Sequence, residues 1–430
     1  MADKKLNIII TGDNGESLPP PYGGIIKRCL LHAKEWKEKG AEVYLHVYHR
    51  HEKENDLGAG ANYFYDFKKE PSKIDKIFFA ANNFLRNPFL FFRLLLLQIK
   101  LNPNFIIGRF LYCAGRGILL DKKIKQIDPD ILITETGCLQ SAVAVFIGKK
   151  NNLPVVLENY AEIQYLLDIS GNNQAERCAR LWDYLVNQAD AVVSASKHCS
   201  QGPKKYVRDE SRIKIIYSGI NFNIFNAQAG KDKAAARKEF GLPHDKFLVM
   251  AVGALKMRKG HDQLLEALLI MPDDVLNKIN VVICGMGSVG DLIKKAGEIG
   301  FPHKSLKIFQ GLSEESLAQL YSSADCFCFP SITPRECMGM AMKEAMAVGL
   351  PIVAYNAGGI KEAIEQGING FLAPVGDQES LALAIKKMMD LGLSGRSFLS
   401  QSNIIKARHF FDIKKTAEQL YQVLLKLVLK

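Results

Sequence analysis

Short apolar runs alternate with longer segments of helical periodicity along most of the chain. In the first half these runs are LNIII, EVYLHVY, DILIT, LPVVLE, DAVVSAS and IKIIYSG, and in the second half FLVMAVG, NVVICG, LKIFQG, DCFCFP and PIVAY. Short buried strands that alternate with helices are typical of βαβ units and parallel sheets. The pattern predicts an α/β protein with two doubly wound, Rossmann-like domains that face each other across a crevice, with a ligand at the carboxyl ends of the strands.

A polar stretch, AQAGKDKAAARKEFGLPHD, separates the two series of strands. We expect residues 1–225 to form the first domain and residues 226–410 the second. Residues 411–430 are predicted to form a C-terminal helix that packs back on the first domain.

The charge balance narrows the choice of partners only slightly. The chain has 56 Lys+Arg against 45 Asp+Glu, a net charge of +11, which suits an anionic ligand, a nucleic acid or an anionic membrane surface. Aromatic residues do not interleave with basic ones, so we predict no nucleic-acid partner. Nine scattered cysteines without CxxC pairs favour a reducing cytoplasm, and the histidines lack metal-ligand spacing, so no metal is expected.

One segment departs from the alternating pattern. Residues 76–101, KIFFAANNFLRNPFLFFRLLLLQIKL, are dense in Phe and Leu, with Arg86, Arg93 and Lys100 interrupting the apolar run. Two interpretations remain open: an interfacial segment on an anionic membrane surface, or a buried helix pair that covers the first sheet.

Two glycine-containing turns are candidate phosphate sites. The segment CGMGSVG contains a GxGxxG match from Gly285 to Gly290 after a strand. The next strand ends in Gln310 instead of a ribose-binding acid, which disfavours NAD. A tight turn and a backbone approach to a nucleotide both remain open. Gly23 and Gly24 precede the first helix, whose N-terminus suits phosphate, although a plain helix start is the alternative.

Basic residues follow the first strand of the second series. VGALKMRKGHD carries Lys256, Arg258 and Lys259 at the end of that strand, where cations would neutralise a pyrophosphate. A solvated basic loop is the alternative.

Two acids lie in an otherwise apolar segment, PSITPRECMGMAMKEAMAVGLP. Pro334 and Gly339 argue against one continuous helix, so we expect Glu336 in a loop, a helix from about Met340 and Glu344 in its early turns. Two carboxylates from different elements would accept hydrogen bonds from the hydroxyls of a polyol, while Glu344 alone would also suit a helix N-terminus.

These segments together resemble a retaining glycosyltransferase of family 4 with the GT-B architecture. The resemblance rests on Glu336, seven residues, Glu344 and AMAVGLPIVAYNAGGIKEAI. SGINFNIF, VVICGMGS, GLSEESLAQLYSSADCFCFPS and RKG occur in the family's order.

The resemblance implies a role for each candidate. Glu344 would hold the ribose, Glu336 the donor sugar, and Lys259 with Arg258 the pyrophosphate. The remaining implied donor contacts are Gly23, Gly24, Gly285, Ser288, Met338, Gly339 and Met340.

Two departures from the family pattern affect this transfer. Ala254 stands where members often have Arg, so Arg258 or Lys256 must supply the second cation. ENYAEIQ stands where many have His, which leaves Asn159, Tyr160 and Glu162 as acceptor-side candidates.

The implied function is transfer of a hexosyl group from a nucleotide-diphosphate sugar, with retained configuration, to a carbohydrate or lipid-linked acceptor. Surface polysaccharide or glycolipid synthesis, such as that of lipopolysaccharide, is the expected setting, in the cytoplasm or on the inner face of the membrane. No metal or cofactor is implied. The alternatives are another GT-B enzyme, a phosphorylase or epimerase, and an inactive nucleotide-sugar-binding module.

Overall fold

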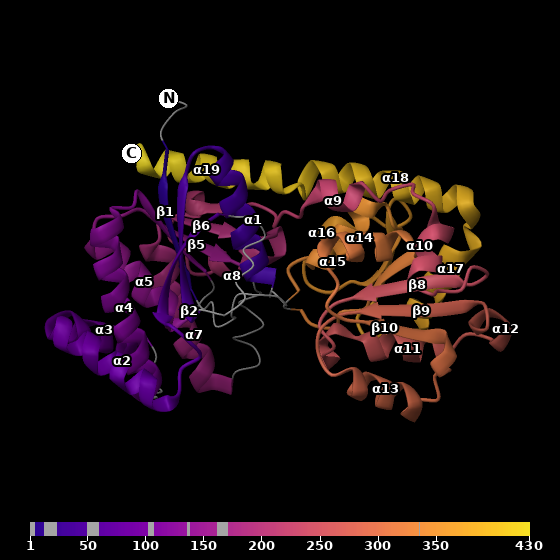
Figure 1. Cartoon of the computed structure of the whole chain (residues 1–430), viewed down its shortest axis with the longest axis horizontal. Helices are drawn as coiled ribbons and strands as arrows, with labels where there is room; N and C mark the ends of the chain where they lie inside the picture. Colours follow the sequence, from indigo (N-terminus) through magenta and orange to yellow (C-terminus); the bar gives the residue numbers. More distant parts are fainter. Residues whose placement is uncertain are drawn as a thin grey trace. The chain divides into compact units, whose positions relative to one another are not determined.

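The computed structural model describes residues 5–12, 24–49, 60–101, 107–135, 138–160, 171–334 and 336–430 (Figure 1). The chain divides into two compact units, Met1–Tyr217 with Thr416–Lys430, and Ser218–Lys415. The boundary between the units thus lies after Tyr217, whereas the boundary predicted from the sequence lies after residue 225.

The described part of the first unit contains a parallel seven-stranded sheet in the order β3-β2-β1-β4-β5-β6-β7. Its strands are β1 (Asn7–Gly12), β2 (Glu42–His49), β3 (Asn62–Phe67), β4 (Ile131–Glu135), β5 (Val155–Asn159), β6 (Ala191–Ser194) and β7 (Ile213–Ile215). Its helices are α1 (Gly24–Glu38), α2 (Lys73–Arg86), α3 (Pro88–Leu101), α4 (Ile107–Ile127), α5 (Leu139–Lys150), α7 (Gly171–Gln188) and α8 (Lys197–Lys204). The central strands β4, β5 and β6 are buried along their whole length, as expected for parallel strands covered on both faces.

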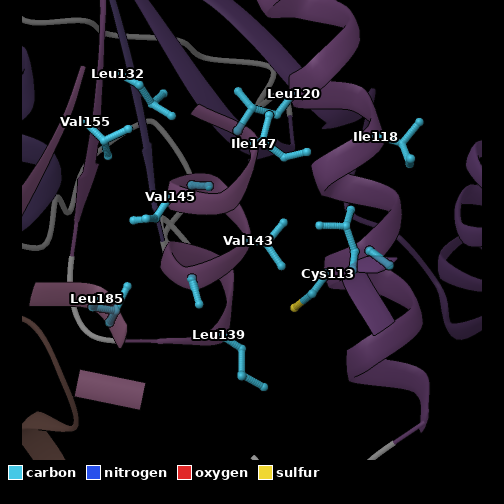
Figure 2. Packing of buried hydrophobic residues seen from close by; sticks show 14 of the residues in the cluster. Cys113, Ile118, Leu120, Leu132, Leu139, Val143, Val145, Ile147, Val155 and Leu185 are labelled. Atoms are coloured by element: carbon cyan, nitrogen blue, oxygen red, sulfur yellow. The ribbon is translucent and has the colours of Figure 1, made fainter. Parts of the chain in front are cut away.

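Aliphatic side chains from α4, α5 and the sheet fill the core of this unit. Figure 2 shows Val143 and Ile147 of α5 between Leu132 of β4 and the side chains of α4. A Cβ added at Gly117 of α4 would lie 2.6 Å from Val143 Cγ1, so glycine lets these two helices approach closely. This close packing buries α4 and α5 against β4 and β5.

The last helix, α19 (Ile413–Val428), contributes to the first unit from Thr416 onward. The indole Nε1 of Trp36 in α1 donates to the carbonyl of Ala417 at 2.9 Å, and Lys39 pairs with Glu418. These contacts attach the end of the chain to α1.

The second unit contains a parallel six-stranded sheet in the order β10-β9-β8-β11-β12-β13, counted over its described residues. Its strands are β8 (Phe247–Val252), β9 (Ile279–Cys284), β10 (Leu306–Phe309), β11 (Cys326–Phe329), β12 (Ile352–Tyr355) and β13 (Gly370–Ala373). Its longer helices are α10 (Lys233–Glu239), α11 (His261–Leu269), α13 (Val289–Glu298), α14 (Glu314–Ser322), α15 (Met340–Val348), α17 (Gln378–Asp390) and α18 (Gly392–Phe410). Its shorter helices are α9 (Phe222–Asn226), α12 (Asp273–Leu276) and α16 (Ile360–Ala363).

The strand order reverses once in each sheet, between β1 and β4 in the first unit and between β8 and β11 in the second. In doubly wound sheets such a switch point leaves a crevice outside the carboxyl ends of the strands, where ligands bind. The predicted α/β class with doubly wound parallel sheets is confirmed, and each unit offers one candidate position for a ligand.

Candidate functional site

Lys259 and Glu336 meet at the switch point of the second sheet. Lys259 ends the short 3-10 turn η2 (Met257–Lys259) after β8, and Glu336 lies in the loop after β11. The Lys259 Nζ is 2.6 Å from Glu336 Oε2, and the Ser331 hydroxyl donates to the same oxygen at 3.2 Å. The side chains of Lys259 and Glu336 are 16% and 11% exposed, respectively. The ion pair is therefore largely shielded from solvent but still accessible to a ligand.

The backbone around this pair leaves room only for glycine at one position. Gly260 has φ 69°, and a Cβ there would lie 1.9 Å from the carbonyl oxygen of Pro330. The carbonyl of Arg258 accepts from the amide of Ile332 at 3.3 Å, which ties the two loops together. The Arg258 side chain is exposed, as is that of Lys256. Of the three predicted cations, Lys259 is therefore the one that lies against Glu336.

The Glu336 loop is fixed on both sides. The Glu336 amide donates to the carbonyl of Thr333 at 3.2 Å, and the Glu336 carbonyl accepts from the amide of Gly359 at 2.9 Å. The position of the carboxylate thus follows from backbone hydrogen bonds as well as from Lys259.

Helix α15 begins at Met340, as predicted, and holds Glu344 in its second turn. Gly339 precedes the helix with φ 64°, where a Cβ would lie 2.4 Å from Cζ of Phe329, and no side chain caps the first turn. The amide groups at this helix start are suited to an anion. Met338 is buried beside them.

Glu344 is almost completely buried and accepts a hydrogen bond from the Tyr321 hydroxyl at 3.2 Å. Burial, followed by the charge of Glu344, raises the pKa of Tyr321 far above its ordinary value. The same two causes raise the pKa of Cys284, at the end of β9, to about 12. Both Tyr321 and Cys284 therefore stay protonated at neutral pH.

The glycine-rich turn after β9 packs closely on the loop after β8. A Cβ at Gly285 would lie 1.8 Å from the carbonyl oxygen of Gly253, and Gln310 donates to the carbonyls of Gly285 and Gly287 at 3.1 and 3.0 Å. The Ser288 hydroxyl accepts from the Asp291 amide and caps α13. This geometry gives Gly285 and Ser288 structural roles; a nucleotide contact by either stays a prediction.

The predicted residues of the first unit are only partly described. Gly24 begins α1, while Gly23 and Glu162 lie outside the described residues. The Asn159 side-chain amide donates to the carbonyl of Cys199 at 2.9 Å, and the Tyr160 ring lies 3.5 Å from Cζ of Arg28.

A buried charge cluster at the first switch point was not predicted. Arg28 of α1 donates to Glu135 Oε1 at 3.1 Å and Glu158 Oε2 at 2.6 Å, and the two acids are paired in register at the ends of β4 and β5. Among the described residues, Arg28 Nε, Glu135 Oε2 and Glu158 Oε1 have no hydrogen-bond partner. Burial raises the pKa of both carboxyls, that of Glu158 to about 7. The sequence signal was a glutamate at the end of each apolar run, ILITE and VVLE.

Within the described ranges, no three histidine, cysteine, aspartate or glutamate side chains gather as metal ligands. That the reaction needs no metal stays a prediction. No helix in the part of the chain that is described is both long and apolar enough to cross a bilayer.

Comparison with known proteins matches the second half of the chain to a family. Residues 232–404 match the family described as "Glycosyl transferases group 1". A D-inositol 3-phosphate glycosyltransferase of Mycolicibacterium gilvum is 27% identical over 237 residues, 53% of this chain and 51% of that protein. An uncharacterized glycosyltransferase of Methanocaldococcus jannaschii is 28% identical over 228 residues, 51% of this chain and 56% of that protein. The chain thus spans about half the length of the curated relatives it matches.

Solved structures resemble the chain over nearly its whole length. Anabaena Alr3699/HepE in complex with UDP-glucose superposes with a TM-score of 0.72 at 18% identity, covering 97% of this chain and 99% of that one. WaaG, a glycosyltransferase involved in lipopolysaccharide biosynthesis, gives a TM-score of 0.70 at 15% identity, covering 97% and 99%. At such identities the likeness shows the fold, which is the predicted GT-B architecture. Residues 232–404, which include Lys259, Glu336 and Glu344, therefore match the glycosyl transferases group 1 family and lie in a chain with the GT-B fold.

Proposed function

We propose that the chain is a retaining glycosyltransferase that moves a hexosyl group from a nucleotide-diphosphate sugar to a carbohydrate or lipid-linked acceptor. The observation that carries this proposal is the contact of Lys259 with Glu336 at the switch point of the family-matched domain. Buried Glu344 and the uncapped start of α15 lie in the same domain and would complete a donor site.

Each group would meet a different part of the donor. The carboxylate of Glu344 would accept hydrogen bonds from the ribose hydroxyls, and Glu336 would accept one from the donor sugar. The ammonium of Lys259 and the amides at Met338, Gly339 and Met340 would face the diphosphate. The exposed guanidinium of Arg258 would supply a second cation when a donor is bound.

The proposed chemistry passes through an oxocarbenium-like transition state. As the glycosidic bond to the diphosphate breaks, negative charge grows on the leaving oxygen, and Lys259 would stabilise it most at that moment. The leaving phosphate would take the proton of the acceptor hydroxyl. This route needs no side-chain base and no metal.

The acceptor and the setting are proposed from the same resemblance. Surface polysaccharide or glycolipid synthesis would use a lipid-linked acceptor, and the enzyme would then act at the anionic inner face of a membrane. The relative named as a D-inositol 3-phosphate glycosyltransferase supports an acceptor rich in hydroxyl groups.

A thermal-shift screen against UDP-, GDP- and ADP-sugars tests the donor assignment, beginning with UDP-glucose, because Alr3699/HepE has been crystallised with it. A cognate donor raises the melting temperature by mass action, since it binds only the native state. NMR spectroscopy of the transfer reaction should then show a product with the donor's anomeric configuration. Stabilisation by a donor without transfer to any acceptor would favour an inactive binding module, and transfer to phosphate or epimerisation of the donor would favour the other GT-B enzymes.

Replacing Glu344 with alanine should raise the KM for the donor. Loss of a hydrogen bond between a charged group and the ribose removes about 1.5–3 kcal/mol of binding, roughly a 10- to 150-fold increase in KM. Glu379→Ala, at an exposed position in the first turn of α17, is the matched control and should leave KM unchanged. An unaltered donor KM in a folded Glu344→Ala protein would reject the ribose role.

A further inference from the structure

Helices α2 and α3 expose large apolar side chains on the surface of the first unit. Figure 1 shows the two helices side by side at one edge of this unit. Leu85 is 77% exposed and Phe89 is 73% exposed. The full set of exposed large apolar residues on the two helices is Ile74, Ile77, Phe78, Leu85, Phe89, Phe92, Leu96 and Ile99. This set is called the apolar face below.

The apolar face follows helical spacing on both elements. On α3 its members recur at intervals of three and four residues, from Phe89 to Ile99, which places them on one side of the helix. The opposite side of α3 packs into the core through Leu90, Phe91 and Leu94. The ring of Phe92 contacts Phe84 of α2, with centroids 5.7 Å apart, so the two helices adjoin here. The helices therefore bury one side in the first unit and present a second apolar side to solvent.

Basic side chains flank the apolar face. Between residues 73 and 101 there are five cations, Lys73, Lys76, Arg86, Arg93 and Lys100, against one acid, Asp75. The Asp75 carboxylate accepts hydrogen bonds from the amide and the hydroxyl of Ser72 in a capping box. The one acid of this segment is therefore engaged at the start of α2. The charged residues that line a hollow of about 500 Å³ beside the start of α2 are Lys68, Lys69 and Asp75, so two further cations lie near the apolar face.

We propose that the apolar face of α2 and α3 binds the surface of an anionic lipid bilayer. The apolar side chains enter the boundary between headgroups and acyl chains, and the flanking cations lie near lipid phosphates. The biological role of this membrane binding rests on the proposed function, because a lipid-linked acceptor lies at such a surface. The binding itself is inferred from the exposed side chains alone.

The charge pattern favours lipid over a second copy of the chain. A symmetric dimer through this face would bring together two patches with an excess of four positive charges each, which repel. A bilayer that contains acidic lipids supplies the opposite charge together with an apolar interior. The occupant is therefore a membrane surface of negative charge.

Vesicle co-sedimentation with the full chain tests the charge component. The protein should sediment with vesicles of phosphatidylcholine and phosphatidylglycerol at low salt, much less with phosphatidylcholine alone, and less again at high salt. Replacing Arg86 and Arg93 by glutamine should lower the partition coefficient about fivefold for each charge. Exposed Lys278 and Lys294 of the second unit, changed to glutamine, are matched controls that should have no effect.

Tryptophan fluorescence tests the insertion of the apolar face. The chain has two tryptophans, Trp36 and Trp182, and both are buried, so a new tryptophan on the surface reports its own surroundings. Phe89→Trp should shift its emission to shorter wavelength when anionic vesicles are added. Phe398→Trp, at a 62% exposed position on α18, should not shift.

The outcomes separate the possibilities. Lack of sedimentation at low salt, equal binding to neutral vesicles, or an unshifted Phe89→Trp spectrum overturns the proposal, and so does a dimer that Leu85→Gln dissociates without vesicles present. Donor stabilisation in the thermal-shift screen needs no lipid, so failure of the membrane proposal leaves the proposed function standing. Conversely, vesicle binding without any donor effect would reject only the proposed function.

Discussion

Replacement of Lys259 by alanine is expected to lower kcat about 100- to 1,000-fold, with a much smaller change in the KM for the donor. The ammonium lies at the switch point of the second sheet, 2.6 Å from Glu336, where we propose that the diphosphate leaves. Negative charge on the leaving group is greater in the transition state than in the bound donor. A group that opposes this charge therefore contributes more to kcat than to ground-state binding.

Steady-state kinetics of three single variants separates this role from a general effect of charge. Lys256→Ala removes the alternative second cation, which is exposed and three residues away, and should leave kcat nearly unchanged if Arg258 supplies that cation. Arg258→Ala tests the second cation, because Ala254 stands where the family often has arginine. A Lys259→Ala enzyme in which KM rises while kcat holds would show that Lys259 binds donor and transition state equally. Circular dichroism checks that the Lys259→Ala protein stays folded although Glu336 has lost its partner.

The strands of both sheets were largely predictable because parallel strands covered on both faces form short apolar runs. β1, β4 and β5 in the first unit, and β8, β9 and β11 in the second, correspond to runs identified in the sequence. The pattern missed two strands. β3, NYFYDF, has no aliphatic residue and includes Asn62 and Asp66, at the edge of its sheet, while β13, GFLA, has four residues and begins with glycine. Neither forms the aliphatic run that marks the other strands.

The donor-side candidates were predictable because local sequence determines their positions. Gly339 ends the loop, α15 follows at once, and Glu344 must then lie in the early turns. The exposed side of α3 was not predictable, because PFLFFRLLLLQIKL is apolar on nearly every side and carries no periodicity that distinguishes core from surface. Only the packing of Leu90, Phe91 and Leu94 against the first unit leaves Phe89 and its neighbours outside.

The buried cluster of Arg28, Glu135 and Glu158 depends entirely on tertiary structure. More than 100 residues separate the arginine from either acid, and no spacing rule joins them. Parallel pairing of β4 with β5 sets the two carboxylates side by side, and α1 brings one guanidinium to both. Two carboxylates that share one cation in a buried site make its charge balance sensitive to pH.

This sensitivity leads to a second large expected effect. Arg28→Met should lower the free energy of unfolding of the first unit by about 3–5 kcal/mol at pH 8, because it leaves two buried carboxylates without a counter-ion. The loss should be much smaller at pH 5. In the native chain burial raises the pKa of Glu158 to about 7 from an ordinary 4.5, so the folded state binds more protons between these values. Stability therefore falls as pH rises through that window, and removal of Arg28 raises both carboxyl pKa values further and steepens the fall.

Urea denaturation at both pH values, followed by the fluorescence of Trp36 and Trp182, reports on the first unit because both tryptophans lie within it. Lys37→Met removes an exposed cation from the same helix and should change stability little at either pH. Adding Glu135→Gln and Glu158→Gln to Arg28→Met removes the uncompensated charges and should restore most of the lost stability at pH 8. An equal loss at pH 5 and pH 8, or no recovery in the triple variant, would mean that Arg28 stabilises the unit through packing of its side chain instead of through charge.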